Sequence, residues 1–245
     1  MDSGFYSAFT GLAARMQSLD VVANNLANVN TSGYKAQKEF FRAFTASLNN
    51  RALTPINQAI NDYGIVEGSR TDFAPGSLDP TGNDTDVAID GTGFFDVKTK
   101  AGGDRYTRNG NFSLNTQRQL VDSQGNLVQG EDGTVQIPQG KLTISTDGTV
   151  SVDGAIVSKL KVVEFPGSVP LTPEGSSNFS APTGSAKPMA SPQLREGMLE
   201  ASNSNPVTGA IALIDVQRSA EMMQRALSIF NTDFNQTAIQ ELSRV

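Results

Sequence analysis

Four aspartates with the chemistry of a metal or catalytic site lie in the middle of the chain, at Asp84, Asp86, Asp90 and Asp96. Carboxylates grouped in this way can bind Ca²⁺ or form the carboxylate pair of a glycoside hydrolase. An EF-hand loop needs an oxygen ligand at its fifth position and glycine at its sixth, where this stretch has Ala88 and Ile89. We interpret the aspartates as solvated strand-end residues and predict no catalytic residue and no metal ligand.

Two arginines and a glycine pair form the next candidate binding features. Arg105 and Arg108 flank Tyr106, an arrangement that fits either an anion or a partner contact, or a hairpin whose charged residues face water. We favour the hairpin. The stretch GTGFF lacks the third glycine of a dinucleotide-binding loop, because Asp96 occupies that spacing, so no cofactor is predicted.

The composition excludes much of enzyme chemistry. The 245 residues include no cysteine, histidine or tryptophan, which removes thiol nucleophiles, imidazole bases and the soft metal ligands. The net charge of −6, without any cluster of Lys or Arg, argues against nucleic-acid binding. The N-terminus lacks the basic and apolar regions of a cleavable signal peptide, and no apolar run predicts membrane insertion.

The two ends of the chain carry apolar residues at alternating spacings of four and three, which is the pattern of a heptad seam. At the N-terminal end these are Phe5, Phe9, Leu12, Met16, Leu19, Ala23 and Leu26. At the C-terminal end they are Leu213, Val216, Ala220, Met223, Leu227, Phe230 and Phe234. The pattern predicts two long helices that pair as a coiled coil, within or between chains; alternatively, each stripe docks onto a globular core.

The middle of the chain has the pattern of short strands joined by tight turns. Asn-Gly and Asp-Gly pairs, such as those at Asp147 and Asp153, favour hairpins between β-branched runs. We therefore predict an α+β fold with long, coiled-coil-forming terminal helices flanking an all-β antiparallel middle domain. The predicted domains are an N-terminal helix over 1–35, an irregular connection over 36–66, a β-rich domain over 67–198 and a C-terminal helix over 199–245.

Several asparagines follow the first predicted helix, in the stretch NNLANVNTSGYK. Asparagine competes for backbone hydrogen bonds and is favoured where helices end, and Gly33 can adopt the left-handed conformation that closes a helix. Asn24 and Asn28 lie one turn apart, with Asn25 beside the seam residue Leu26. The amides either contact neighbouring chains and fix their register, or form a solvated, capped helix end.

These residues carry a resemblance to a known family. The segment GFYSAFTGLAARMQSLDVVANNLANVNTSGYKAQ resembles the N-terminal signature of bacterial flagellar rod and hook proteins, approximately A-x-N-L-A-N-x-x-T-x-G-Y/F-K/R. The matching positions are Asn25, Leu26, Ala27, Asn28, Thr31, Gly33, Tyr34 and Lys35. The segments DVAIDGTGFFDV and YTRNGNFSLN are similar to those of the FlgF/FlgG family of rod proteins, and EASNSNPV resembles its C-terminal part. Length, the opening Met-Asp and YTRNGN favour the FlgF type.

The resemblance implies a structural subunit of the flagellar basal-body rod, which spans the periplasm. Its expected partners are other copies of itself, neighbouring rod proteins and the flagellar type III export apparatus, which would export it without a cleavable signal peptide. The residues expected to carry assembly are Phe5, Phe9, Leu12, Met16, Leu19, Asn24, Asn25, Leu26, Asn28, Thr31, Gly33, Tyr34, Leu213, Val216, Met223, Leu227, Phe230 and Phe234. The alternative is a secreted β-rich carbohydrate-binding or carbohydrate-active protein.

Overall fold

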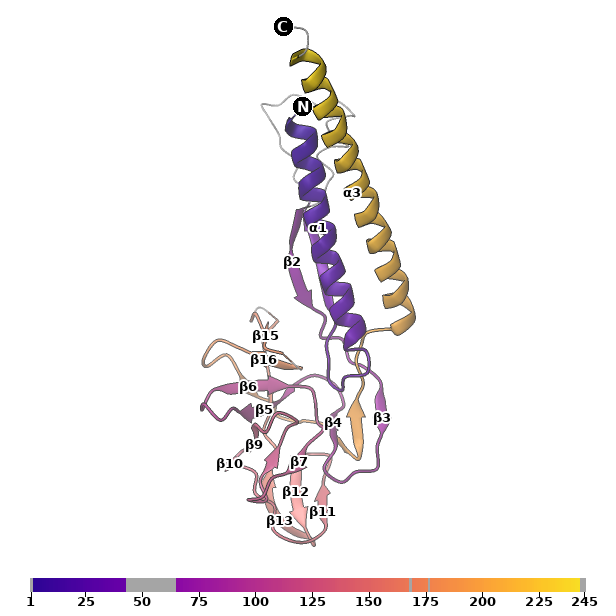
Figure 1. The fold of residues 1–245 in the computed structure, drawn as a ribbon. Coiled ribbons are helices and arrows are strands. Elements are labelled where there is room, and N and C mark those ends of the chain that lie inside the picture. Colours follow the sequence, from indigo (N-terminus) through magenta and orange to yellow (C-terminus); the bar gives the residue numbers. More distant parts are fainter. Residues whose placement is uncertain (1, 43–64, 168, 176, 243–245) are drawn as a thin grey trace. The chain divides into compact units, whose positions relative to one another are not determined.

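A computed structural model describes residues 2–42, 65–167, 169–175 and 177–242 (Figure 1). The chain divides into two units, each assembled from separate segments. Unit 1 comprises the described residues of 1–27, 37–72 and 205–245, and unit 2 comprises those of 28–36 and 73–204. Unit 1 therefore contains the first and the last of the described residues, while unit 2 contains most of the strands.

Unit 1 is built from two helices and a hairpin. Helix α1 (Asp2–Ala27) packs against helix α3 (Pro206–Leu242) and against the antiparallel strands β1 (Gln37–Arg42) and β2 (Ile65–Thr71) (Figure 1). Asn205 caps α3, because its side-chain oxygen accepts hydrogen bonds from the amides of Val207 (2.9 Å) and Thr208 (3.2 Å). Pro206 occupies the first helical position, where its missing N–H costs nothing.

The predicted fold class, with long coiled-coil-forming terminal helices, is wrong. The described residues show two helices flanking a large β-rich middle, and the predicted seam of α1 is not a buried seam. Phe9 and Met16 are 57% and 56% exposed, whereas Gly11, Ser18 and Val21 are the buried positions over residues 9–27, the part of this helix whose side chains are described. The physical reason is that α1 has two kinds of neighbour, α3 and the β1–β2 hairpin, so its contact face is wider than a heptad seam.

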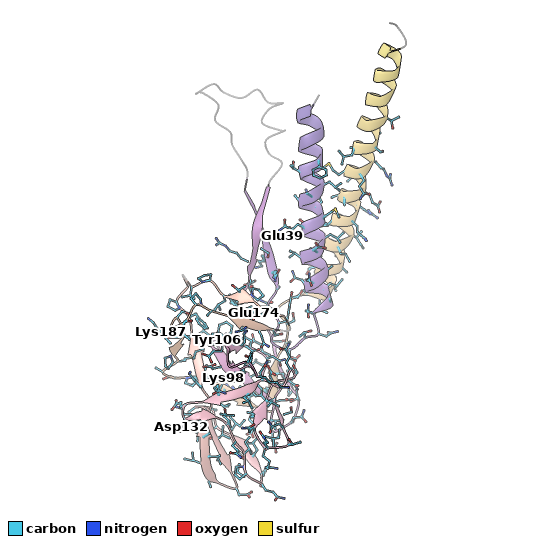
Figure 2. The ribbon with its side chains drawn as sticks, turned by 60° about the vertical axis from the view of Figure 1, so that its left-hand side comes forward. Glu39, Lys98, Tyr106, Asp132, Glu174 and Lys187 are labelled. Carbon is cyan, nitrogen blue, oxygen red and sulfur yellow. The ribbon has the colours of Figure 1, made fainter. Side chains whose placement is uncertain are left out.

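Two polar contacts fasten strand β1 to helix α1. The Asn25 amide group donates to the backbone oxygen of Gln37 (2.8 Å) and accepts from its N–H (2.8 Å), as a neighbouring strand would. The buried Ser18 hydroxyl donates to a carboxylate oxygen of Glu39 (2.7 Å), the β1 residue labelled in Figure 2. The segment 45–63, which the sequence leaves ambiguous, lies outside the described residues.

The strands of unit 2 are short, and every pairing that the structure describes is antiparallel. They are β3 (Leu78–Pro80), β4 (Val87–Ile89), β5 (Phe94–Lys98), β6 (Asp104–Thr107), β7 (Ser113–Leu114), β8 (Leu120–Val121), β9 (Leu127–Gly130), β10 (Gly133–Thr134), β11 (Leu142–Ile144), β12 (Thr149–Val152), β13 (Ala155–Lys159), β14 (Val162–Glu164), β15 (Thr172–Pro173), β16 (Asn178–Ser180), β17 (Lys187–Pro188), β18 (Leu194–Glu196) and β19 (Met198–Glu200).

The strands form one large sheet and several small ones. The ten-stranded sheet runs β15-β16-β6-β5-β9-β8-β7, with β10, β14 and β17 attached at its sides, and β11-β12-β13 form a separate sheet. The incoming strands β3 and β4 pair with the outgoing strands β19 and β18, respectively. Between these ladders, the Gly197 N–H donates to the Asp86 oxygen (2.8 Å). The two ends of the middle segment are therefore joined to each other.

Unit 2 buries apolar side chains in two clusters, one on each face of β5. Phe95 and Val97 belong to the larger cluster, while Phe94 packs in the smaller one with Tyr106, Val163 and Phe179. This separation follows from the alternation of side chains along a strand. The Asp-Gly turn between β12 and β13 behaves as predicted, since Asp153 (φ 49°) and Gly154 (φ 83°) both have positive φ.

Within the residues that the structure describes, neither helix combines the length and the apolar character that a membrane span requires.

Candidate assembly site

The signature segment includes the last residues of helix α1, which ends at Ala27, and belongs to unit 2 from Asn28 onward. The Thr31 hydroxyl donates to the Asn28 side-chain oxygen (3.2 Å), and the Thr31 N–H donates to the Asn28 backbone oxygen (3.1 Å). Gly33 has φ +67°, which confirms the predicted left-handed residue. The asparagine and threonine side chains of the signature thus make the turn that stops the helix.

Gly33 is also required for a close contact that the sequence did not reveal. A Cβ at this position would come nearer than 3.0 Å to the backbone of Arg108 and Asn109, which real Cβ atoms essentially never do. The Gly33 N–H also donates to the backbone oxygen of Glu200 (2.7 Å). Gly33 therefore contacts two backbone segments that are distant in sequence, and a residue with a Cβ would collide with one of them.

Lys35, the last residue of the signature, is the centre of a buried charge cluster. Its ammonium group donates to Glu200 Oε1 (2.5 Å) and to the backbone oxygen of Ala74 (2.8 Å). Glu200 Oε1 also accepts from the Gly76 N–H (3.0 Å), and Glu200 Oε2 accepts from the Arg108 guanidinium (3.2 Å). Side-chain exposure is 0% for Lys35, 1% for Glu200 and 3% for Arg108, so two buried cations share one buried carboxylate and the cluster carries a net positive charge.

Arg108 is buried, and the preferred interpretation that it faces water is wrong. Its second guanidinium nitrogen donates to the Gly91 oxygen (2.7 Å), and its guanidinium lies over the Phe94 ring, 5.3 Å from the centroid. Burial lowers the pKa of Arg108, and the neighbouring Glu200 carboxylate opposes that shift. Its Nε lacks a hydrogen-bond partner among the residues that the structure describes. Arg105 instead forms an ion pair with Glu174 (2.5 Å), a residue labelled in Figure 2.

A second polar residue ties the same segments together. The Asn203 side-chain oxygen accepts from the Ala36 N–H (2.7 Å), and its amide nitrogen donates to the Ala74 oxygen (3.1 Å). Asn203, Lys35 and Glu200 thus hold together the segments 33–36, 74–76 and 200–203. The sequence contained a partial signal for this arrangement, because Lys35 belongs to the signature, but its partners lie 39 and 165 residues away.

The predicted assembly residues fall into different environments. Asn24 is exposed and donates to the Asp20 oxygen (2.8 Å), whereas Asn25 is engaged with β1. Tyr34 is half-buried, and burial raises its pKa. The half-buried apolar members are Leu12, Leu19, Leu26, Leu213, Val216, Met223 and Leu227. The side chains of Phe5, Phe230 and Phe234 lie outside the described ones, so their predicted role remains a prediction.

Sequence reasoning missed a second apolar stripe on α3. Its members are exposed by about half or more: Val207, Ile211, Ile214, Met222 and Ile229. The first three are spaced by four and three, the same alternation as in the recognised stripe. The apolar spacing of this stripe can be seen in the sequence. Because two such stripes alternate along one helix, the sequence does not show which of them packs inside the unit and which stays exposed.

The clustered aspartates of the middle domain make internal contacts. Asp86 is buried and accepts from the side chains of Asn83 (3.0 Å) and Asn111 (3.0 Å). Asp96 is buried beside Lys161 (2.7 Å), and Asp90 pairs with Arg195 at the surface (3.1 Å). For Asp86 and Asp96, the solvated interpretation is therefore wrong. Across the described ranges, no three acidic side chains lie together as a metal site would require.

Comparisons with known proteins agree with the signature and with the β-rich middle. The family model "Flagella basal body rod protein" matches residues 5–35, and "Flagellar hook protein FlgE/F/G D1 domain" matches residues 88–152. The chain is 32% identical to the flagellar basal-body rod protein FlgF of Caulobacter vibrioides over 100% of both chains. It is 33% identical to FlgF of Escherichia coli and 29% identical to FlgG of Borreliella burgdorferi, each over 93% of this chain and 94% of the relative. The chain therefore belongs to the family of flagellar basal-body rod proteins.

Proposed function

We propose that this chain is a structural subunit of the bacterial flagellar basal-body rod, where it polymerises with other copies and with neighbouring rod proteins and performs no catalysis. The observation that carries the proposal is the similarity to a rod protein over the full length of both chains. If this chain and the relative had only one domain in common, part of each chain would remain unmatched. The relatives give no support to the carbohydrate-active alternative.

The exposed apolar residues of the two helices are the proposed contacts with neighbouring subunits. Phe9 and Met16 on α1, and Ile211, Ile214 and Met222 on α3, are exposed by about half or more. Such residues in a row are unusual on the surface of a monomer and are typical of interfaces. Burying each side chain contributes about 1.5 to 3 kcal/mol, so a few of them suffice to favour association. Asn24, which is exposed on α1, is a proposed register contact.

Deletion of the gene tests the proposed function. Cells without this chain are expected to lack complete basal bodies and motility, and the wild-type gene is expected to restore both. Electron micrographs of isolated basal bodies would show where the axial structure stops. Complete rods in the deletion strain would contradict the proposal.

The export route is a further part of the proposal. We expect the flagellar type III apparatus to transport the chain, with the N-terminal segment as part of its address. Removal of residues 2–35 should abolish transport, whereas removal of the middle residues 100–102, in an exposed turn, should leave it intact. Export of the first variant at the wild-type level would argue against this route.

A further inference from the structure

The chain crosses between the two units four times, after residues 27, 36, 72 and 204. We call these four points passages. Several of the unit 2 segments beside them are bonded to one another. Within unit 2, Ala36, Ala74 and Asn203 are each the first or second residue from one of these passages, and they share hydrogen bonds through the Asn203 side chain. We call the segments 33–36, 74–76 and 200–203, together with Arg108, the junction.

The buried charges of the junction bind all its segments at once. Glu200 receives the Lys35 ammonium group, the Gly76 N–H and the Arg108 guanidinium on one carboxylate. Lys35 reaches the Ala74 oxygen with the same nitrogen that contacts Glu200. The carboxylate is therefore a common acceptor for donors from three distant parts of the sequence, and no single contact can change without disturbing the others.

Buried charges contribute little to the stability of a fold, but their hydrogen bonds can restrict how the surrounding segments are arranged. Transfer of ions from water is costly, and apolar residues of similar volume often stabilise a fold as well or better. In this cluster, by contrast, the Glu200 carboxylate can accept from both Lys35 and Arg108 only when the segments that carry them are correctly placed. Apolar residues in these positions would fill the space without specifying how the segments 33–36, 74–76 and 200–203 lie against one another.

We propose that Lys35, Glu200 and Arg108 are positioning residues that fix the paths of the junction segments, and that rod assembly requires this fixed geometry. The signature residues Gly33 and Lys35 then act within the chain and not at a contact between subunits. This inference rests on the proposed rod function for its assembly component, whereas its structural component concerns the isolated chain.

The variant Lys35→Met tests the structural component, because methionine has a similar length and no charge. We expect amides of Gly33, Ala36 and Gly76 to exchange hydrogen about a hundredfold faster, since Lys35→Met removes a buried donor from both Glu200 Oε1 and the Ala74 oxygen, although Arg108 still pairs with Glu200. The core strands β5 and β9 should keep their protection. Lys159→Met is the matched control: it breaks the exposed pair with Glu131 (2.9 Å) and should leave junction exchange unchanged.

Assembly is measured by complementation of the deletion strain. Lys35→Met should fail to restore rods, whereas Lys35→Arg should restore them, because the family pattern accepts either residue at this position. Lys159→Met should behave as wild type. If Lys35→Met does not fold, Glu200→Gln, which keeps the shape and one acceptor oxygen, replaces it in both measurements.

Three results would overturn the inference. These are unchanged junction exchange, a uniform loss of protection that includes β5 and β9, or normal rods with Lys35→Met and Glu200→Gln. If the wild-type gene itself fails to restore rods, the proposed function is wrong, but the exchange measurement still decides the structural component. The two failures can therefore be distinguished.

Discussion

Gly33 has a left-handed backbone conformation and lies close to the backbone of Asn109. The free-energy cost of replacing glycine can be measured separately for each of these two properties. Gly33→Ala is expected to destabilise the protein through the φ of +67° and through overlap with the backbone of Asn109. Gly82 provides the matched control, because it has φ +73° and a Cβ added there would meet no atom within 4 Å. Gly82→Ala should cost about 1 to 2 kcal/mol for the backbone conformation alone.

The difference between the losses of unfolding free energy in Gly33→Ala and Gly82→Ala measures the effect of the close approach between the chain segments. Gly33→Ala should cost about 1 to 3 kcal/mol more than Gly82→Ala, because a crowded backbone must move to admit the methyl group. Urea denaturation of both variants gives the two free energies of unfolding. Equal losses for the two alanine variants would show that the segment near Asn109 can relax freely.

Asp96 gives a pH dependence whose sign follows from its burial. Burial raises the pKa of this carboxyl group, although the Lys161 ammonium group 2.7 Å away opposes the shift. The folded state therefore binds the proton more tightly than the unfolded state, whose aspartate has a pKa of about 3.9. Between that value and the raised pKa, stability should increase as the pH falls.

The variant Asp96→Asn removes this titration. The free energy of unfolding of the wild type, minus that of Asp96→Asn, should grow as the pH is lowered from 7 through the raised pKa. Denaturation curves at a series of pH values measure this difference. A difference that stays constant over the whole series would refute a raised pKa at Asp96.

At the scale of residues, local features could be predicted and distant partners could not. Gly33 has the left-handed conformation that its position after an asparagine-rich helix end indicates. Arg108 was expected to face water because the favoured interpretation of this stretch was a hairpin whose charged residues are solvated. Its burial depends on Glu200, 92 residues further along the chain, and no local pattern encodes that pairing.

At the scale of elements, α3 presents different residues to its own unit and to the outside. Ala220 is buried, whereas Ile214 is 49% exposed. Ile214→Asp should leave the monomer as stable as the wild type and block assembly, because it places a charge in the proposed contact surface. Ala220→Asp should destabilise the monomer by about 3 kcal/mol, because it buries a charge without a partner.

The exposed polar residue Gln217 supplies the control for both changes on the same helix. Gln217→Asp should affect neither helicity nor rod formation. Thermal unfolding followed by circular dichroism, together with complementation of the deletion strain, measures all three variants. Normal rods with Ile214→Asp would remove this residue from the proposed contact surface.

Strands were easier to locate from the sequence than the packing of the helices. The Asp-Gly pair at Asp153 marks the turn between β12 and β13, because positive φ angles at a tight turn leave few residue types to choose from. The heptad spacing of α1 indicated a helix but gave the wrong contact face. Spacing shows which residues share a face, while Ser18 and Asn25 contact a hairpin whose position only the folded chain reveals.

At the scale of the whole molecule, the two units differ in the size of their apolar cores. Among the described side chains, those buried and apolar in unit 1 are Val21 and Ala220, whereas unit 2 has a continuous cluster that includes Phe95, Val97 and Val128. In the isolated chain, the helical signal in circular dichroism should therefore be lost at a lower temperature than the main calorimetric transition.

The variant Val128→Ala assigns the two transitions. It removes buried methyl groups from unit 2 and should lower the main transition by about 2 kcal/mol of stability without moving the loss of helix. Coincident loss of both signals in the wild type and in the variant would mean that the units unfold as one.

The pairing of β3 with β19, and of β4 with β18, has a consequence for how such a protein can change in size. These ladders close the base of the segment from Asp90 to Gln193, so its two ends stay together whatever lies between them. Extra or missing turns beyond the base would lengthen or shorten the loops without separating the ends. The segment between β4 and β18 can in this way vary in length among related proteins while the β3–β19 and β4–β18 pairings stay the same.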